Sequence, residues 1–286
     1  MLKQLLHKIG LYRLAFPPGH FASPIPDFNA LLNDSSLFDE GREIHGIDFR
    51  LEKQVEALKE LESALKGHPY HQASEALRYG FNNGMLGPMD ALILYAMLVQ
   101  HKPKQVIEVG SGYSSAIMLD VNNTHRDDEM TLTFIEPYPS RLHSLLKKQD
   151  YQRAVILEQK IQDVNLDIFK ALNENDILFL DTSHIVKTGS DVNFWLFHIL
   201  PVLEPGVLIH IHDIFWPMEY PKEWIIQQKC YTELYLIRAF LMNNSAYEIQ
   251  LFNNMLQQKS ASVLNDIDPI LMSSQGGSIW LKKVKR

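Results

Sequence analysis

The sequence predicts an α/β protein with a doubly wound, mostly parallel sheet of seven strands. After residue 104, short apolar runs rich in β-branched residues alternate with helix-compatible segments, the pattern of a parallel sheet covered on both faces. The first run ends in a Gly-Ser-Gly turn that leads into a helix. The preceding residues are mainly helical in pattern and lack a strand ladder. We therefore expect a helical N-terminal cap region over 1–103 and an α/β domain over 104–286.

Periodicity and chain breakers predict the element boundaries. Apolar residues at spacings of three and four predict helices over 51–66, capped by Asp48, and over 90–99. The long polar stretch 253–277 exceeds what a hairpin needs, so it is expected to be an insertion or mobile loop. The expected strands are 105–109, 131–135, 154–158, 176–180, 207–211, 247–252 and 278–284. The further helices are expected at 114–122, 140–149, 165–172, 192–200 and 230–241.

The glycine turn within residues 106–115 points to small-molecule binding. Glycines let a ligand approach the backbone, and the following helix start presents unpaired N–H groups. Ser115 stands where a dinucleotide-binding turn has its third glycine, which counts against close pyrophosphate approach. Glu108 lies in the first strand, and Glu136 ends the second, where a carboxylate can accept both hydroxyls of a ribose.

Four segments, in this order, resemble the motifs of the class I S-adenosylmethionine-dependent methyltransferases. They read Glu-Val-Gly-Ser-Gly-Tyr-Ser-Ser, Phe-Ile-Glu-Pro-Tyr-Pro, Leu-Phe-Leu-Asp-Thr-Ser-His and His-Ile-His-Asp-Ile-Phe. Within this superfamily, the chain is similar to a poorly characterised bacterial branch with a helical N-terminal extension. The resemblance covers the chain from residue 104 to the end. It implies a Rossmann-like sheet whose last strand is antiparallel.

The resemblance also implies S-adenosylmethionine as cofactor and the residues that hold it. Its amino-acid end falls to the glycine turn and the helix start, its ribose to Glu136, and its adenine amine to Asp163. For Glu108, the alternative is a structural role at the helix N-terminus or in an ion pair. The residues implied at the cofactor are Glu108, Gly110, Ser111, Gly112, Tyr113, Ser114, Glu136, Asp163 and Asp181.

Asp181 and Asp213 close two strands that we expect to be neighbours. Because neighbouring strands lie about 4.8 Å apart, the two carboxylates can converge on one cation or one substrate group. Some small-molecule O-methyltransferases hold magnesium at the corresponding strand ends, and by this resemblance Asp181 and Asp213 are candidate metal ligands. The nearby histidines His184, His210 and His212 suit a softer ion such as zinc, manganese or iron.

Without a metal, a histidine supplies the general base. An imidazole with a pKa near 6.5 accepts a proton at neutral pH, so His184 and His212 join Asp181 and Asp213 as catalytic candidates. Alternation along the strand places His210 and His212 on one face, with His212 nearer the cleft and His210 expected in the core. For His184, the alternative role is a hydrogen bond that orders its loop.

Two further segments supply candidate acceptor contacts. Segment 78–88, rich in Asn and Gly, offers Arg78, Tyr79 and Asn82, and the aromatic segment 215–224 offers Trp216 and Tyr220. Aromatic surface near a sulfonium cofactor can wall the acceptor and exclude water. The alternatives are a plain turn and hydrophobic packing of a connector. In the next helix, Glu233 and Arg238 are expected to form an ion pair.

Composition excludes several classes of protein. At 286 residues and a net charge of −7, the chain is not expected to bind nucleic acid. Cys230 is the single cysteine, so no intrachain disulfide forms, and neither a signal peptide nor a membrane-spanning stretch is visible. A cytoplasmic location is expected. Apolar residues at helical spacing at the N-terminus, Leu2, Leu5, Leu6 and Ile9, favour packing on the body or on a second copy in a homodimer over a membrane surface.

The expected activity is methyl transfer from S-adenosylmethionine to a small-molecule acceptor, at oxygen rather than nitrogen. The cluster of acids and histidines, suited to activating a hydroxyl, carries the preference for oxygen. One rival is a dinucleotide-dependent oxidoreductase, against which the missing third glycine counts. Another is a non-catalytic module that binds the cofactor or a partner. A hydrolase is disfavoured because no serine lies on a nucleophile elbow.

Overall fold

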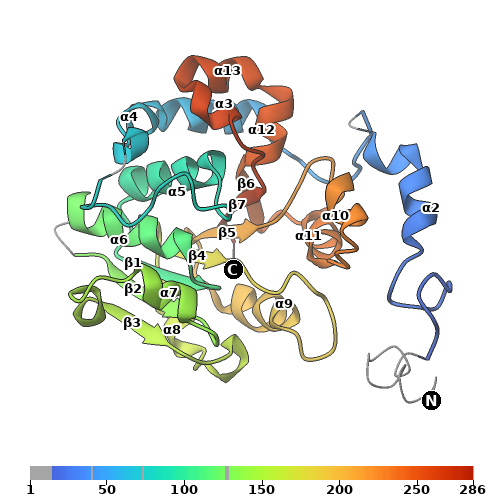
Figure 1. The fold of residues 1–286 in the computed structure, drawn as a ribbon, viewed down its shortest axis with the longest axis horizontal. Helices are drawn as coiled ribbons and strands as arrows, with labels where there is room; N and C mark the ends of the chain where they lie inside the picture. Colours follow the sequence, from blue (N-terminus) through green and yellow to red (C-terminus); the bar gives the residue numbers. More distant parts are fainter. Residues whose placement is uncertain (1–14, 40, 73, 126–128, 286) are drawn as a thin grey trace.

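The computed structural model describes residues 15–39, 41–72, 74–125 and 129–285. Seven strands form one sheet in the order β3-β2-β1-β4-β5-β7-β6 (Figure 1). β1 to β5 run parallel, and β7 is antiparallel to both β5 and β6. The predicted α/β fold is therefore confirmed. The strands are β1 (Gln105–Val109), β2 (Thr131–Ile135), β3 (Ala154–Leu157), β4 (Ile177–Leu180), β5 (Leu208–His212), β6 (Tyr247–Phe252) and β7 (Ser278–Lys283).

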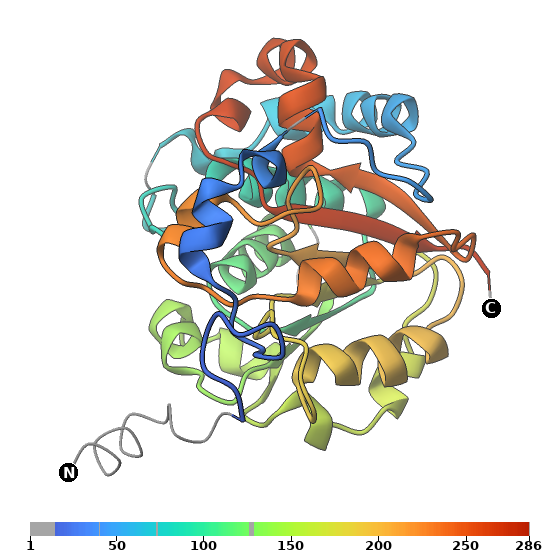
Figure 2. The ribbon, with the colours of Figure 1, turned by 90° about the vertical axis from the view of Figure 1, so that its right-hand side faces the viewer.

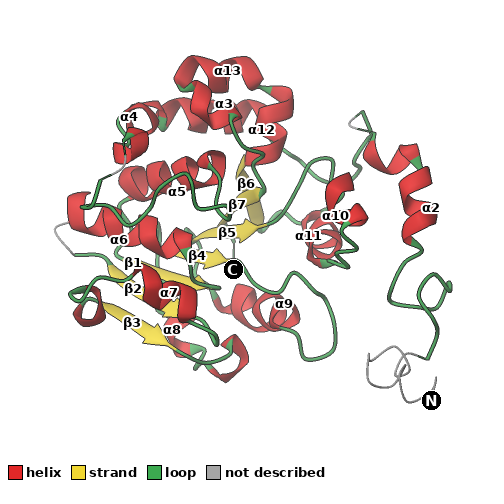
Figure 3. Cartoon of the chain, viewed as in Figure 1, coloured by secondary structure: helices red, strands yellow, loops and turns green. Residues whose placement is uncertain are grey.

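Helices cover both faces of the sheet (Figure 3). Successive strand residues point to opposite faces, so Val106 and Phe179 enter one hydrophobic cluster while Ile107 and Leu178 enter the other. The first cluster is covered by α3 (Leu51–Glu60), α4 (Glu62–Lys66), α5 (Pro88–His101), α6 (Tyr113–His125), α7 (Ser140–Leu145), α12 (Asn253–Lys259) and α13 (Ala261–Ile267). The second is covered by α8 (Asp167–Lys170), α9 (Asp191–Phe194), α10 (Lys222–Ile226) and α11 (Glu233–Leu241).

The order of strands reverses between β1 and β4. Ligands of open α/β sheets bind in the crevice beyond the carboxyl ends of the strands at such a reversal. Here the Gly110 N–H donates to the Ile135 carbonyl at 3.0 Å, and the Asp181 N–H donates to the Val109 carbonyl at 2.9 Å. These bonds pin the glycine turn after β1 between the ends of β2 and β4.

The stretch 253–277 is mostly helical, which corrects the expected insertion or mobile loop. α12 and α13, followed by a 3-10 turn at Pro269–Met272, bury Leu256, Leu264 and Leu271 in the first cluster. The stretch looks polar partly because buried polar side chains hold it in place. Asn253 donates to Asp90 at 2.8 Å and to the Ser278 hydroxyl at 2.9 Å.

Other helix boundaries also differ from expectation. The helix expected over 51–66 divides at Leu61, and Asp48 accepts from the Arg50 N–H instead of capping the helix. α11 begins at Glu233 and not at Cys230, because the preceding residues form a loop tied to the β4 end. The helix expected over 192–200 is α9 followed by a π turn at Trp195–Ile199. The expected N-terminal helix with Leu2, Leu5, Leu6 and Ile9 lies outside the described residues.

A buried ion-pair cluster ties the segment before α5 to the helical layer. The Arg78 guanidinium lies 2.9 Å from Asp120 in α6 and 2.6 Å from Asp150 before β3, and all three side chains are at most 2% exposed. Asp120 also accepts from the backbone N–H groups of Arg78 and Tyr79. These contacts assign Arg78 a structural role.

The segment before α3 lies on the outer side of the molecule. Its helix α2 (Phe28–Asn33) begins at Asp27, whose carboxylate accepts from two N–H groups of the first turn. α2 contacts α10 and adds apolar side chains to the second cluster (Figures 1 and 2). Across the described ranges, no helix combines the length and the apolar character needed to cross a membrane.

Candidate active site

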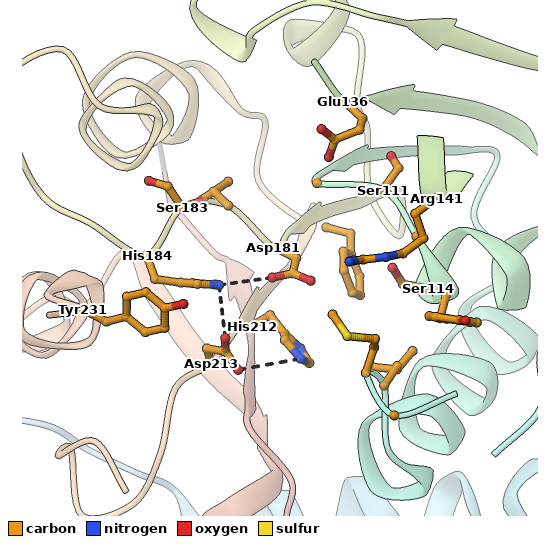
Figure 4. A pocket seen from close by; sticks show the side chains of 18 of the residues that line it. Ser111, Ser114, Glu136, Arg141, Asp181, Ser183, His184, His212, Asp213 and Tyr231 are labelled. Carbon is orange, nitrogen blue, oxygen red and sulfur yellow. Dashed lines mark ion pairs between the residues drawn. The ribbon is translucent and has the colours of Figure 1, made fainter. Parts of the chain in front are cut away.

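A cleft lies at the carboxyl ends of β1, β2, β4 and β5 (Figure 4). It consists of two adjoining cavities, of about 560 Å³ and about 500 Å³. Gly110, Glu136 and Asp181 line both cavities, so the two meet over the glycine turn. The larger cavity also contains Ser111, Gly112, Tyr113 and Ser114. This shape suits an elongated ligand that crosses the turn.

Gly110 is required by the close approach of two strand ends. Its φ is +85°, and a Cβ at this position would overlap the main-chain carbonyl of Asp181. Gly112 is less constrained, because a Cβ there would lie 3.2 Å from the flexible Arg141 side chain. The glycine turn therefore brings the end of β1 against the end of β4 and lets Arg141 cross above it.

Glu108 lies beneath the glycine turn and lines neither cavity. Its two carboxylate oxygens accept hydrogen bonds from the hydroxyls of Ser114 and Ser115, at the start of α6. Burial raises the pKa of Glu108 to about 8, against the opposing effect of the serine hydroxyls. The contacts are those of a residue that fixes the helix start.

His184 is the centre of a cluster of acids. Its Nε2 lies 3.2 Å from Asp181 Oδ1 and 3.1 Å from Asp213 Oδ2, as Figure 4 shows. Its Nδ1 lies 2.7 Å from Glu233 Oε2. Asp181 follows β4, Asp213 follows β5, and Glu233 begins α11. The expected convergence of the two strand-end carboxylates is observed, and they meet at an imidazole.

The backbone of His184 is held as firmly as its ring. Its φ of +58° lies in the left-handed region, which is uncommon for a residue other than glycine. Its carbonyl accepts the N–H groups of Thr232 at 2.9 Å and Glu233 at 3.1 Å. The loop that follows β4 is thus fixed to the start of α11.

The acids determine the protonation of this cluster. Burial lowers the pKa of His184, but hydrogen bonds to Asp181 and Glu233 and the charges of Glu233 and Asp213 outweigh it, so its pKa lies well above the ordinary value. Burial raises the pKa of Asp181, yet the charge of His212 and the hydrogen bond from His184 bring it below the ordinary value. In the absence of a metal, His184 is therefore an imidazolium held between carboxylates.

His210 and His212 share one face of β5, as the alternation predicts. His212 lines the larger cavity, with its Nε2 3.9 Å from Asp213 Oδ1. His210 is buried, stacks on Phe179 with ring centroids 3.9 Å apart, and lies 3.2 Å from His212 Nδ1. Burial lowers the pKa of His210 well below its ordinary value, so it is a neutral core histidine.

The smaller cavity extends from the glycine turn toward the segment after β3. Glu136 lies where the two cavities meet, and one of its oxygens accepts the Tyr138 N–H at 2.7 Å. The other oxygen has no protein partner among the described residues and faces the cleft in Figure 4. Ile161 and Gln162 line this cavity, whereas the neighbouring Asp163 is exposed and does not.

The outer wall of the larger cavity is formed by one residue of α10 and two residues of the loop between α10 and α11. Trp224, Lys229 and Tyr231 line it. The Lys229 ammonium lies 4.0 Å from the Trp224 ring centroid and 5.8 Å from that of Tyr231. The Tyr231 ring centroid lies 5.2 Å from that of His184. The wall is therefore aromatic and carries one positive charge.

The four residues predicted to contact the acceptor lie outside both cavities. Tyr79 is buried and donates to the Leu86 carbonyl, and Tyr220 is buried and accepts from the Leu234 N–H. Trp216 packs edge-on against Phe49 and Phe252, and Asn82 is exposed. The aromatic residues of 215–220 turn into the core, so residues a few positions later supply the wall.

Sequence reasoning missed several residues of the cleft. Glu233 was assigned to an ion pair with Arg238, but its carboxylate bonds His184, 49 positions away in the chain. Arg141, early in α7, extends toward Asp181 in Figure 4 and forms no ion pair within the described ranges. Position directly after Asp181 was an available signal for Thr182 and Ser183. The larger cavity is also lined by Gly84, Met85, Leu86, Phe179, Lys229 and Tyr231, which were not singled out, and by Trp224, the last residue of the aromatic segment 215–224.

Comparison with known proteins agrees with this architecture. A family model described as a methyltransferase domain matches residues 107–214. An uncharacterised protein of Archaeoglobus fulgidus is 35% identical over 170 residues, which cover 57% of this chain and 76% of that protein.

Two solved structures have related folds at low identity. The SAH-bound methyltransferase PaMTH1 of Podospora anserina is 14% identical, with a TM-score of 0.49 over 83% of this chain and 97% of its own. The O-methyltransferase TomG of Streptomyces achromogenes, involved in tomaymycin synthesis and solved with SAM, is 12% identical, with a TM-score of 0.42 over 83% of this chain and 90% of its own. By its family match and its sheet order with an antiparallel β7, the chain belongs to the class I S-adenosylmethionine-dependent methyltransferases.

Proposed function

We propose that this methyltransferase transfers the methyl group of S-adenosylmethionine to a hydroxyl of a small molecule, at a divalent cation held by Asp181, His184 and Asp213. The observation that carries the proposal is the convergence of these three side chains beside the glycine turn. One potential ligand atom from each lies within 4.8 Å of the others. The cluster lies in the same cavity as the cofactor turn, so an acceptor bound there meets the methyl donor.

The cleft fits the cofactor on both sides of the turn. The unpaired Glu136 oxygen suits a ribose hydroxyl, and the smaller cavity accommodates a purine. For the amino-acid end, the Ser111 hydroxyl is buried with no hydrogen-bond partner among the described residues, and the start of α6 lies beside it. Arg141 reaches into the same cavity, and its guanidinium suits the cofactor carboxylate. Asp163 remains a candidate for the adenine amine.

The side chains around His184 also fit a metal ion. Metal-binding histidines commonly donate their second ring nitrogen to a carboxylate, and Glu233 accepts from His184 Nδ1 in this way. Nε2 is then free to face a cation between Asp181 and Asp213. Two carboxylates and one imidazole suit manganese, iron or zinc as well as the magnesium expected from two acids. A bound cation would lower the pKa of an acceptor hydroxyl and orient it.

The chain's own residues then position the reaction and accept the proton. Methyl transfer is an in-line displacement: the sulfur–carbon bond breaks with its electron pair on sulfur, and the acceptor oxygen forms the new bond. His184 has Nδ1 on Glu233, and its Nε2 would face the cation, so it is not available as base. His212 lines the cavity with Nε2 toward Asp213, and although burial lowers its pKa, the charges of Asp181 and Asp213 outweigh burial and raise it. A cation between those two carboxylates would offset their charge and leave His212 as the neutral imidazole that accepts the hydroxyl proton.

The test separates cofactor binding from chemistry. The purified protein is first treated with a chelator to remove metal and then titrated with S-adenosylmethionine in a calorimeter. Release of S-adenosylhomocysteine is measured separately with catechol and related acceptors, with and without Mg²⁺, Mn²⁺ or Zn²⁺. We expect cofactor binding without metal and turnover only with metal, which Asp213→Asn abolishes. Metal-independent O-methylation lost in His212→Gln would refute the cation and leave the general-base route. Tight binding of reduced nicotinamide dinucleotide without binding of S-adenosylmethionine would favour the alternative function of an oxidoreductase.

The proposal includes a division into a cap over 1–103 and a catalytic domain over 104–286. It also includes a cytoplasmic location and small-molecule acceptors, with no binding to nucleic acid or membranes. We also propose a homodimer. Light scattering at several protein concentrations measures the molar mass, and a monomer at every concentration would refute the homodimer.

A further inference from the structure

We propose that the acceptor is a hydroxylated aromatic acid and that Lys229 binds its carboxylate. This inference rests on the proposed function, because it names the acceptor class of the same cavity. It starts from the outer wall, which combines Trp224, Lys229 and Tyr231. These three residues lie beyond the residues matched by the family model.

Lys229 is a cation without a counter-charge in the part of the chain that the structure describes. Its ammonium lies over the Trp224 ring at 4.0 Å, and within the described ranges no Asp or Glu forms an ion pair with it. Cation–π contact with a tryptophan orients an ammonium without neutralising it. The donors of Lys229 therefore remain available to an anion that enters the cavity.

The segment that carries Lys229 is tied to the His184 cluster. The Lys229 N–H donates to the Trp224 carbonyl at 3.0 Å, which closes the turn after α10. Thr232 and Glu233 donate to the His184 carbonyl, and the Thr232 hydroxyl accepts the Val186 N–H at 2.7 Å. Because both ends of the segment are fixed, the separation between the Lys229 cation and the cluster is set by the fold.

Tyr231 borders both sites. Its ring centroid lies 5.8 Å from the Lys229 ammonium and 5.2 Å from the His184 ring centroid, so both sites are within reach of one substituted aromatic ring. An acceptor ring packed against Tyr231 can thus place a hydroxyl at Asp181 and Asp213 and a carboxylate at Lys229. Trp224, with its ring centroid 5.4 Å from that of Tyr231, offers a second aromatic surface.

Charge favours one orientation of such an acceptor. The positive charge of the cluster is already balanced by the carboxylates of Asp181, Asp213 and Glu233. An acceptor carboxylate therefore gains more at the Lys229 ammonium, which has no carboxylate partner among the described residues. The reacting hydroxyl is therefore the one most distant from the carboxylate, and a positively charged acceptor is disfavoured at the wall.

The test compares three acceptors that share the catechol ring and carry a negatively charged substituent, no substituent or a positively charged substituent: 3,4-dihydroxybenzoate, catechol and 3,4-dihydroxybenzylamine. Release of S-adenosylhomocysteine gives kcat/KM for each with full-length protein. We expect the acid to be preferred over catechol and the amine to be poorest. Lys229→Met should reduce the preference for the acid about 10- to 100-fold, the range of a hydrogen bond to a charged group, through KM more than kcat. Lys229→Arg should keep most of it.

Lys222→Met is the matched control, because Lys222 lies on the neighbouring α10 over the Phe38 ring and outside the cavity. It should leave the preference unchanged. Equal losses for acid and catechol in Lys229→Met, or no preference in the wild type, would overturn the role of Lys229 while the proposed methyl transfer stands. Without turnover of any acceptor, the proposed function fails. In that case, fluorescence titration of the S-adenosylhomocysteine-loaded protein tests the role of Lys229 separately. If the acid binds no more tightly than catechol, Lys229 does not bind the acceptor carboxylate.

Discussion

Replacing Arg78 with methionine should destabilise the fold by about 3–4 kcal/mol at neutral pH. The side chain of Arg78 donates to Asp120 and Asp150, and both carboxylates are essentially buried. Removing one partner of a buried pair typically costs about 3–5 kcal/mol, because a buried charge remains. Asp120 retains two backbone N–H donors and Asp150 retains that of Lys147. These donors place the expected cost in the lower part of the range.

The cost should decrease as the pH falls. Burial raises the pKa of Asp120 even with Arg78 present, and removal of the guanidinium raises it further. An acid with a raised pKa in the folded state contributes stability that is present below its unfolded pKa and lost as the pH rises through the folded value. The difference between Arg78→Met and wild type should therefore be largest above the raised pKa and smaller near about pH 4.

Urea unfolding followed by circular dichroism measures this difference at several pH values. Lys170→Met is the control, because Lys170 pairs with Asp167 on the surface, where solvent screens the pair, and its loss should leave the unfolding free energy almost unchanged. Adding Asp120→Asn and Asp150→Asn to Arg78→Met should restore part of the stability. A loss below about 1 kcal/mol at neutral pH, or one that does not change with pH, would refute the account of a buried charge cluster.

Three further outcomes follow from the site. Because burial raises the pKa of Glu108 to about 8, unfolding free energy should decline from about pH 5 to about pH 9, and Glu108→Gln should flatten that decline in a pH series of urea titrations. Gly110→Ala should abolish cofactor binding in calorimetry, since its Cβ overlaps the Asp181 carbonyl, whereas Gly112→Ala displaces only Arg141 and should weaken binding modestly; equal effects would contradict this geometry. Glu233→Gln should reduce metal affinity about 10- to 100-fold with cofactor affinity retained, and unchanged metal affinity would remove Glu233 from the site.

The parallel strands were predictable because their signals are local. β1 and β2 are apolar runs bounded by turn residues, and both were predicted at their observed limits. The Gly110 turn and the acids at the strand ends were also predictable, since parallel strands bring their carboxyl ends to one edge. The positions of Asp181 and Asp213 in one cluster follow from that topology.

Contacts between distant segments were not predictable in this way. Glu233 and His184 meet only because α11 packs beside the β4 end, and no spacing rule connects them. Composition assigned the aromatic segment after β5 to the acceptor. Tyr220 is instead buried, because burying an aromatic ring in the core stabilises the fold more than exposing it in a cleft. Composition identifies an aromatic segment, whereas packing decides which of its rings face the ligand.

The family match divides the cleft into two parts. Residues 107–214 contain the glycine turn, Glu136, Asp181, His184 and Asp213, to which we assign the cofactor and the cation in the proposed function. The outer wall with Lys229 lies beyond them. Yet Glu233, also beyond the match, bonds His184 directly and fixes the orientation of its ring. Exchanging the outer wall between relatives would therefore change the contacts of His184 as well as the proposed acceptor contacts, unless the exchanged segment carried a carboxylate at the position of Glu233.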